Sequence, residues 1–435
     1  MEKKLLLGDE AIALGAIHAG IRGVYAYPGT PSTEITEYIQ RHPLARARGL
    51  HSTWCTNEKT AVEAALGASY AGARVIACMK HVGLNVAADA FVNAAITGVN
   101  GGMIVVVADD PSMHSSQNEQ GSRFYGKFSM ITTLEPSTQQ EAYDMMQYGF
   151  ELSEREKLPV LMRIVMRLAH SRAAVTVKEE AEEVRALPCA KDPASWVLLP
   201  ANSRRKYAAL VEQQPRLEQA AAEAPYTRYE QASGEKPVGI LACGIGYNYV
   251  TEVREAAEKF NILKITQYPL PADLVRRLAA DSREILVEDG QPFAEELVRG
   301  MLSADYPVRG RLTDDLPRTG ELTPDSVAAA MGHRPERYFE APKNVVGRPP
   351  ALCQGCGHRD VYTALNEVVK EYPDARVFAD IGCYTLGALP PFRAIDTCLD
   401  MGASITMAKG AADAGVFPAI AVIGDSTFTH SGMTG

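Results

Sequence analysis

The residues Gly424, Asp425, Ser426 and Thr427 place a carboxylate and two hydroxyl groups directly after the apolar residues 419–423. A short apolar run that ends in a turn signal is typical of a buried parallel strand. Open α/β sheets bind ligands at the carboxyl ends of their strands, and oxygen donors suit Mg²⁺ ions that bridge phosphates. We therefore expect Asp425 to bind a metal, although it can instead cap the following helix.

A second polar stretch, Cys353-Gln-Gly-Cys-Gly-His-Arg, precedes a predicted helix. Glycines let backbone N–H groups approach a phosphate, and the helix directs its positive end toward the same place. Gly357 and His358 therefore indicate a diphosphate cradle. The spacing of Cys353 and Cys356 also fits half of a zinc site, but the chain has no second cysteine pair at that spacing.

Three side chains in the first half of the chain are candidates for catalysis. Glu58 begins a predicted helix after a short strand, where a side chain faces a ligand, although the helix dipole alone also favours glutamate there. His81 follows a strand and can transfer a proton near neutral pH, or it is a satisfied surface histidine. Arg123 lies on a polar, glycine-containing loop, and there it either pairs with a substrate carboxylate or is solvated.

Helices and apolar strands alternate along most of the chain, which predicts an α/β fold with several doubly wound parallel sheets covered on both faces. Up to residue 175 we expect strands at 23–27, 50–54, 74–79, 102–108 and 158–164, and helices at 9–20, 57–70 and 84–96. The last strand of the chain has no further crossover to bury it, so its domain is expected to be incomplete.

The domain organisation follows from where this alternation is interrupted. We expect an α/β domain over 1–175, a connector over 176–235, a second α/β domain over 236–335, a proline-punctuated linker over 336–350 and a third α/β domain over 351–435. The connector lacks strand alternation and is expected to be helical on either side of Pro215. Gly244-x-Gly246 lacks the third glycine of a dinucleotide fingerprint, so we expect no NAD site.

Composition excludes several classes of protein. The net charge is −9 without a long basic cluster, which argues against nucleic acid or an anionic membrane surface as the main partner. No apolar run reaches the roughly 18 residues of a membrane-spanning helix. The apolar run near the N-terminus is too short for the apolar region of a signal peptide. The eight cysteines are scattered over 435 residues, which favours a cytoplasmic protein with reduced thiols.

Motifs along nearly the whole chain resemble the α subunit of indolepyruvate:ferredoxin oxidoreductases, within the 2-oxoacid:ferredoxin oxidoreductase family. Besides the stretch at 353–359, they are Tyr27-Pro-Gly-Thr-Pro-Ser-Thr-Glu, Asn57-Glu-Lys-Thr-Ala, Met79-Lys-His-Val-Gly-Leu-Asn, Ser115-Ser-Gln-Asn-Glu-Gln, Asp380-Ile-Gly-Cys-Tyr and Gly424-Asp-Ser. The last is similar to the start of the thiamine diphosphate signature. The resemblance implies a pyrimidine-binding first domain, a second domain like the transketolase C-terminal domain, and a diphosphate-binding third domain.

The resemblance also implies thiamine diphosphate and Mg²⁺ as cofactors and gives residues of this chain their roles. Glu58 would hydrogen-bond the aminopyrimidine ring and favour the tautomer that accepts the C2 proton, while His81 would face the reacting carbon. Asp425 would hold Mg²⁺, with Thr427 as a partial substitute for a later ligand. The other cofactor-binding residues would be Pro28, Gly29, Thr30, Cys356, Gly357, His358, Gly382, Cys383, Gly402, Gly424 and Ser426.

The implied reaction is the oxidative decarboxylation of arylpyruvates such as indolepyruvate. Coenzyme A would take the acyl group, and electrons would pass through [4Fe–4S] clusters to ferredoxin, in a dimer of α subunits that binds a β subunit. The clustered Cys-x₂-Cys runs of the full α subunit are missing here apart from one pair, so we expect the front part of that subunit, weak cofactor binding and no ferredoxin reduction by this chain alone. A non-oxidative thiamine diphosphate decarboxylase or ligase, and a non-catalytic subunit, remain as alternatives.

Overall fold

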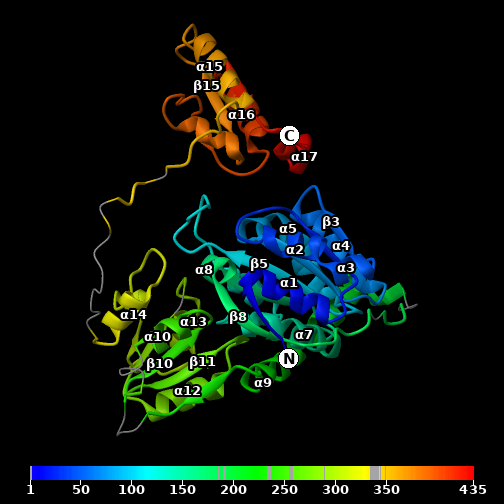
Figure 1. Cartoon of the computed structure of the whole chain (residues 1–435), viewed down its shortest axis with the longest axis vertical. Coiled ribbons are helices and arrows are strands. Elements are labelled where there is room, and N and C mark those ends of the chain that lie inside the picture. The colour runs from blue at the N-terminus through cyan, green and yellow to red at the C-terminus, as the bar shows by residue number, and fades with distance from the viewer. Residues whose placement is uncertain are drawn as a thin grey trace. The chain divides into compact units, whose positions relative to one another are not determined.

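The computed structural model describes residues 2–184, 186–189, 193–232, 237–253, 258–288, 290–333, 342, 344–347 and 349–435. The chain divides into two compact units, residues 1–336 and 337–435 (Figure 1). Eight of the fifteen residues of the predicted linker at 336–350 lie outside the described residues.

A seven-stranded sheet forms the centre of the first unit. In spatial order its strands are β12 (Gln267–Tyr268), β6 (Thr133–Leu134), β7 (Val160–Val165), β5 (Met103–Asp109), β4 (Val75–Lys80), β2 (Gly23–Ala26) and β3 (His51–Trp54). Neighbouring strands are parallel except β12, which is antiparallel to β6. Every residue of β4 and β5 is buried, as expected for strands that are covered on both faces.

Helices cover both faces of this sheet (Figure 1). Alternate residues of β4 belong to two different cores: one contains α1 (Gly8–His18) and α7 (Gln139–Glu156), and the other contains α4 (Glu58–Tyr70) and α5 (His81–Thr97). The remaining helices of the region are α2 (Thr33–Arg41), α3 (Pro43–Ala47), α6 (Arg123–Ser129), α8 (Met166–His170) and α9 (Pro200–Ala222).

A smaller five-stranded sheet follows in the same unit. Its order is β14 (Val308–Arg309), β13 (Ile285–Glu288), β10 (Gly239–Cys243), β11 (Asn261–Ile265) and β9 (Arg228–Glu230). Four strands are parallel, and β9 pairs antiparallel with β11 at one edge. Its helices are α10 (Gly246–Glu252), α12 (Ala272–Asp281), α13 (Phe293–Met301) and α14 (Pro324–Ala330).

The second unit contains a three-stranded parallel sheet in the order β16 (Thr397–Cys398), β15 (Arg376–Ala379) and β17 (Ala419–Val422). Its helices are α15 (Gly357–Val369), α16 (Ala403–Asp413) and α17 (Asp425–His430). Mostly parallel sheets in both units confirm the predicted α/β class, whereas the domain boundaries stay a prediction.

The chain start and the connector contain strands that the sequence pattern did not predict. Residues Glu2–Leu7 form β1, which pairs antiparallel with β8 (Arg172–Val177) in a separate two-stranded sheet. The connector contains the edge strand β9, and it is helical on either side of Pro215, as predicted, within the single helix α9. Leu210 and Leu217, on either side of that proline, are buried in a core of the first sheet, so tertiary packing holds the helix together.

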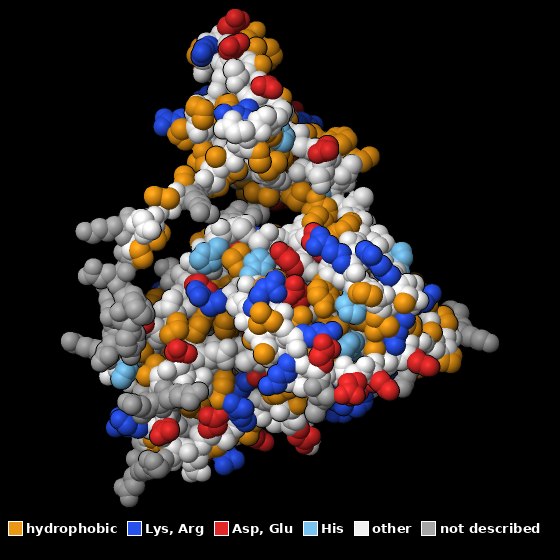
Figure 2. Space-filling model, in the orientation of Figure 1, with side chains coloured by type: hydrophobic (Ala, Val, Ile, Leu, Met, Phe, Trp, Pro, Cys, Tyr) orange, Lys and Arg blue, Asp and Glu red, His pale blue; other side chains and the backbone are white. Residues whose placement is uncertain are grey.

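The surface agrees with the mixed charge of the sequence. On the face of the first unit in view, acidic and basic side chains are interspersed rather than segregated (Figure 2). Within the described residues, no helix combines the length and the apolar character that a membrane crossing requires.

Candidate functional site

The carboxyl ends of β2, β3, β4 and β5 lie at one edge of the first sheet, because these strands are parallel neighbours. Ligand sites of open α/β sheets lie at this edge. Residues 28–30 follow β2, Glu58 begins the helix after β3, and His81 follows β4. The structure therefore brings Pro28, Gly29, Thr30, Glu58 and His81 to the same edge.

Glu58 is buried at the first position of α4, with 6% of its surface exposed. Asn57 caps this helix by accepting a hydrogen bond from the Thr60 N–H at 2.9 Å. The Glu58 side chain lies directly over Gly83 in the first turn of α5, since a Cβ atom added to Gly83 would be 2.5 Å from the Glu58 Cγ and Oε1 atoms. This arrangement places a largely dehydrated carboxyl group at the edge where open α/β sheets bind ligands.

Lys80 ties the end of β4 to the loop after β5. Its Nζ atom donates to the Ser115 carbonyl at 2.8 Å and lies 4.0 Å from the Asp110 carboxylate. Asp110 accepts hydrogen bonds from the Ser115 N–H and the Ser116 hydroxyl, which outweigh the effect of its burial and lower the pKa of Asp110. Gly29 packs on Lys80, because an added Cβ would be 3.1 Å from the Lys80 Cβ. The loops after β2 and β5 thus meet around this lysine.

His81 is 1% exposed, so the alternative of a surface histidine is wrong. Its Nε2 atom lies 3.3 Å from the Asn118 carbonyl in the loop after β5. Burial lowers the pKa of His81, and the nearby Asp109 carboxylate opposes this only in part. The imidazole is therefore neutral at pH 7 and can accept a proton.

Arg123 is neither on a loop nor solvated, so both of those expectations are wrong. It begins α6, is 1% exposed, and its Nη1 atom lies 3.6 Å from the Glu135 carboxylate and 3.4 Å from the Tyr268 hydroxyl. Burial raises the pKa of Glu135, but the guanidinium groups of Arg123 and Arg163 lower it further, to below its ordinary value. Arg123 already faces a charged carboxylate, and its role toward a substrate stays a prediction.

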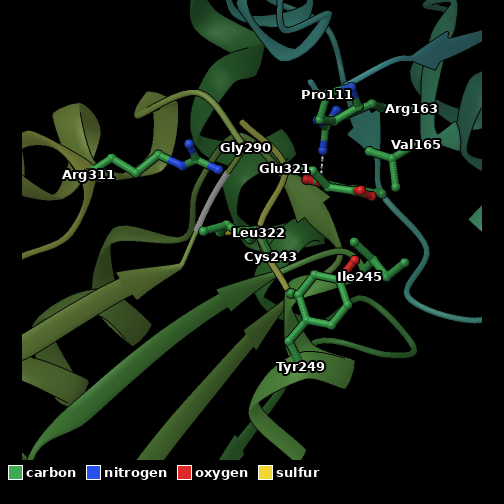
Figure 3. Close-up of a pocket in the computed structure, with 12 residues that line it drawn as sticks. Pro111, Arg163, Val165, Cys243, Ile245, Tyr249, Gly290, Arg311, Glu321 and Leu322 are labelled. Atoms are coloured by element: carbon green, nitrogen blue, oxygen red, sulfur yellow. Dashed lines mark hydrogen bonds and ion pairs between the residues drawn. The ribbon is translucent and has the colours of Figure 1, made fainter. Parts of the chain in front are cut away.

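Arg123, Glu135 and Arg163 form an ion-pair cluster. A pocket lies beside this cluster, between the two sheets of the first unit (Figure 3). Arg163 and Val165 line it from β7, and Cys243 and Tyr249 line it from β10 and α10. No predicted site residue is among the described residues that line this pocket. Sequence reasoning missed it because its walls come from distant segments, although an arginine within the apolar β7 was a visible signal.

In the second unit, the segments after β15 and β17 lie at one edge, because these strands are parallel neighbours. The Tyr384 ring packs against Gly382 and Gly424, and a Cβ added at Gly424 would be 2.8 Å from its Cε1 atom. The Tyr384 hydroxyl donates to Asp380, whose other carboxylate oxygen accepts from the Ser404 hydroxyl at 2.7 Å. Both predicted glycines are thus required by the close approach of a tyrosine ring.

The residues of the predicted diphosphate cradle lie at the start of α15. Cys356 is the N-terminal cap residue of this helix, and its Sγ atom lies 3.3 Å from His358 Nδ1, while Cys383 Sγ lies 3.9 Å from the same nitrogen. The structure thus brings Cys356, Gly357, His358 and Cys383 together. Among the described residues, no group of three metal donors within 4.8 Å of one another includes Cys353 or Cys356.

Asp425 begins α17 and is exposed, so its carboxylate is accessible to a cation. Thr427 is 2% exposed, and its hydroxyl donates to the Ile381 carbonyl at 3.1 Å, which turns it away from solvent. Asp425 therefore fits the predicted metal role better than Thr427. Gly402 has a φ of 94°, and an added Cβ would be 2.8 Å from Ser431, so packing of α16 alone explains this glycine.

This chain is similar in sequence to one protein family and to several of its members. The family described as "Pyruvate flavodoxin/ferredoxin oxidoreductase, thiamine diP-bdg" matches residues 14–235. Indolepyruvate oxidoreductase subunit IorA of Archaeoglobus fulgidus is 39% identical over 451 residues, which cover 99% of this chain and 72% of the relative. IorA of Pyrococcus horikoshii is 39% identical over 469 residues, with the same coverage. This chain belongs to the IorA family.

A solved structure shows the same fold at greater distance. The 2-oxoglutarate:ferredoxin oxidoreductase from Magnetococcus marinus superimposes with a TM-score of 0.61 at 19% identity, covering 76% of this chain and 65% of that chain. Membership of the IorA family supports a thiamine diphosphate-dependent 2-oxoacid:ferredoxin oxidoreductase subunit and suggests that a partner subunit exists. The matched region contains Glu58, His81 and Arg123.

Proposed function

We propose that this chain is the α subunit of an enzyme that oxidatively decarboxylates arylpyruvates, of which indolepyruvate is the representative. Coenzyme A would take the acyl group and ferredoxin the electrons, with [4Fe–4S] clusters in the full-length subunit and a β subunit as partner. One observation carries the proposal: a buried carboxyl group, Glu58, lies at the ligand-binding edge of a chain that is 39% identical to IorA over 99% of its length.

The residues of the first sheet edge fit the pyrimidine end of thiamine diphosphate. The Glu58 side chain is excluded from water, so a hydrogen bond to a ring nitrogen would be strong there. Its position is fixed from two sides, by the capped start of α4 and by contact with Gly83. Glu58 would hold and orient the ring, and residues 28–30 would lie beneath it.

The residues of the second unit fit the diphosphate end. The backbone N–H groups at the start of α15, a helix of 13 residues, and the His358 ring would donate to phosphate oxygens. The exposed carboxylate of Asp425 would hold the Mg²⁺ ion that neutralises them. When bound, the cofactor supplies the electron sink for loss of CO₂ from the 2-oxoacid.

His81 is the proposed proton-transfer group. Because burial lowers its pKa, the ring is neutral at pH 7 and would accept a proton from the substrate. Lys80 is held by Ser115 and Asp110, so its role would be to fix the loop that covers this edge.

The experiment is a substrate comparison with the full-length α subunit co-produced with its β subunit. Initial rates of ferredoxin reduction are measured with indolepyruvate, 2-oxoglutarate and pyruvate, with and without coenzyme A. We expect indolepyruvate to have the highest kcat/KM and the rate to depend on coenzyme A. Preference for 2-oxoglutarate, aldehyde formation without an electron acceptor, or no turnover with any 2-oxoacid would each contradict the proposal.

A further inference from the structure

Three side chains of types that bind metals converge from three helices of the first unit. Asp9 is on α1, Glu34 is on α2 and His170 is the last residue of α8 (Figure 1). Their donor atoms all lie within 4.8 Å of one another, and His170 Nε2 is 3.4 Å from Glu34 Oε2. In the part of the chain that the structure describes, this is the one group of three such donors.

Asp9 is the group that most needs a partner. It is 0% exposed, and neither of its carboxylate oxygens has a hydrogen-bond partner. The Glu34 Oε2 atom beside it is also buried and accepts no hydrogen bond. Among the described residues, no lysine or arginine forms an ion pair with either carboxylate. Burying a carboxylate without a partner lowers the stability of the fold by roughly several kcal/mol. A cation at this point would therefore be strongly favoured.

The fold holds these donors on rigid elements. A Cβ atom at Gly8 would clash with the Leu168 carbonyl, so the start of α1 lies directly against α8. Ile12 of α1 and Ile35 of α2 are buried in the same core, which fixes α1 against α2. The three side chains therefore meet because of packing between helices and not through a flexible loop.

We propose that Asp9, Glu34 and His170 form a divalent-cation site for Mn²⁺ or Zn²⁺. Two carboxylates and one imidazole are ligands that both ions accept, and water would complete the coordination. Neighbouring ligands of a tetrahedral zinc ion are about 3.3 Å apart, close to the 3.4 Å between His170 and Glu34. The side chains of His170 and Glu34 are 33% and 39% exposed, which gives an ion a path from solvent to the buried Asp9.

The site would act as a brace between helices. It would tie α2, which begins at Thr33 just after residues 28–30, to α1 and α8. It does not depend on the proposed oxidoreductase activity, because its three ligands are separate from the residues assigned to thiamine diphosphate. Burial and the neighbouring Glu34 carboxylate raise the pKa of Asp9.

The test is a titration of the chelator-treated chain with MnCl₂ alone, followed by electron paramagnetic resonance of free Mn²⁺. Mn²⁺ is chosen because the thiolates of the second unit bind it poorly. We expect one tight site per chain, at least a tenfold loss of affinity in His170→Ala and Asp9→Asn, and a rise in Tm when Mn²⁺ is added. His170 is exposed, so its variant tests the site even if Asp9→Asn fails to fold.

One control separates this site from other acidic groups. His114→Ala removes a histidine that lies 3.3 Å from Glu321 and belongs to no group of three metal donors among the described residues. This variant should bind Mn²⁺ like the unchanged chain. Absence of saturable binding, or unchanged binding in His170→Ala, would overturn the proposal.

Discussion

At the residue scale, the proposed function depends on how tightly the Glu58 side chain is positioned. The carboxyl group is buried, the start of its helix is capped by Asn57, and the absence of a side chain at Gly83 makes room for it. These contacts lie within two short sequence motifs. Sequence reasoning could therefore select Glu58, although the role of Gly83 as its neighbour needed the structure.

Glu58→Gln keeps the size of this side chain but replaces the carboxyl group by an amide, which cannot gain or lose a proton near neutral pH. We expect about a 100-fold or greater fall in kcat for 2-oxoacid-dependent ferredoxin reduction, with thiamine diphosphate affinity nearly unchanged. The matched control is Glu63→Gln on the same helix, since Glu63 is exposed and pairs only with Lys59 among the described residues. Turnover of Glu58→Gln within tenfold of the unchanged enzyme would exclude the proposed role.

Gly83→Ala tests the close contact itself. The added methyl group would overlap the Glu58 side chain, so we expect a loss of about 1–3 kcal/mol in the free energy of unfolding, together with lower activity. Gly67→Ala is the control, because its added Cβ meets nothing within 4 Å and helix propensity should stabilise it by about 0.5–1 kcal/mol. Urea unfolding of both variants would show the predicted opposite signs, and equal effects would contradict this explanation.

At the scale of helices and strands, elements with a clear local sequence pattern were predictable, and strands defined by long-range pairing were not. The strands β4 and β5 were predictable because they are continuous apolar runs between turn signals. The strands β1, β8, β9 and β12 were not. β9 and β12 have only three and two residues, and β1 pairs with β8, which is distant in the sequence. Charged residues inside apolar elements, such as Arg163 in β7, were the signal of a buried ion-pair cluster that sequence reasoning missed.

The ion-pair cluster joins the ends of β5, β6 and β7. Arg163 donates to Asp109 at 2.6 Å and also to Glu135, and all three side chains are buried. Arg163→Met would leave two buried carboxylates short of a partner, so we expect a loss of about 3–5 kcal/mol in the free energy of unfolding. Arg41→Met, which breaks an exposed pair with Glu37, should change it by about 0.5 kcal/mol or less. Equal effects in denaturant unfolding would contradict a stabilising role for the cluster.

The end of α1 should make stability depend on pH. His18 accepts or donates a hydrogen bond with the Tyr143 hydroxyl at 2.6 Å, and burial together with nearby positive groups lowers the pKa of His18 to about 4. The unfolded chain, with a histidine pKa of about 6.5, binds the proton more readily between pH 6.5 and pH 4. Stability should therefore fall as pH decreases through this window.

The matched variant for this prediction is His18→Gln. We expect the drop in Tm between pH 7 and pH 4.5 to be smaller in the variant than in the unchanged chain, because one proton-linked group is lost. The same drop in both proteins would show that His18 does not contribute to the acid sensitivity.

At the scale of the whole molecule, the proposed cofactor site has two halves in different compact units. Glu58 belongs to residues 1–336, and Asp425 and His358 belong to residues 337–435. The proposal therefore requires that the two units meet, within one chain or between chains of an α-subunit dimer. Each half is predicted from a short, local sequence motif, but no local pattern gives the arrangement of the two units.

The most direct measurement is a crystal or cryo-electron microscopy structure of the full-length oligomer with thiamine diphosphate and Mg²⁺ bound. The account predicts a Glu58 carboxyl oxygen at hydrogen-bond distance, about 2.7–3.2 Å, from a pyrimidine nitrogen, and the Asp425 carboxylate on the Mg²⁺ ion at the diphosphate. A bound cofactor that touches neither Glu58 nor Asp425 would contradict it.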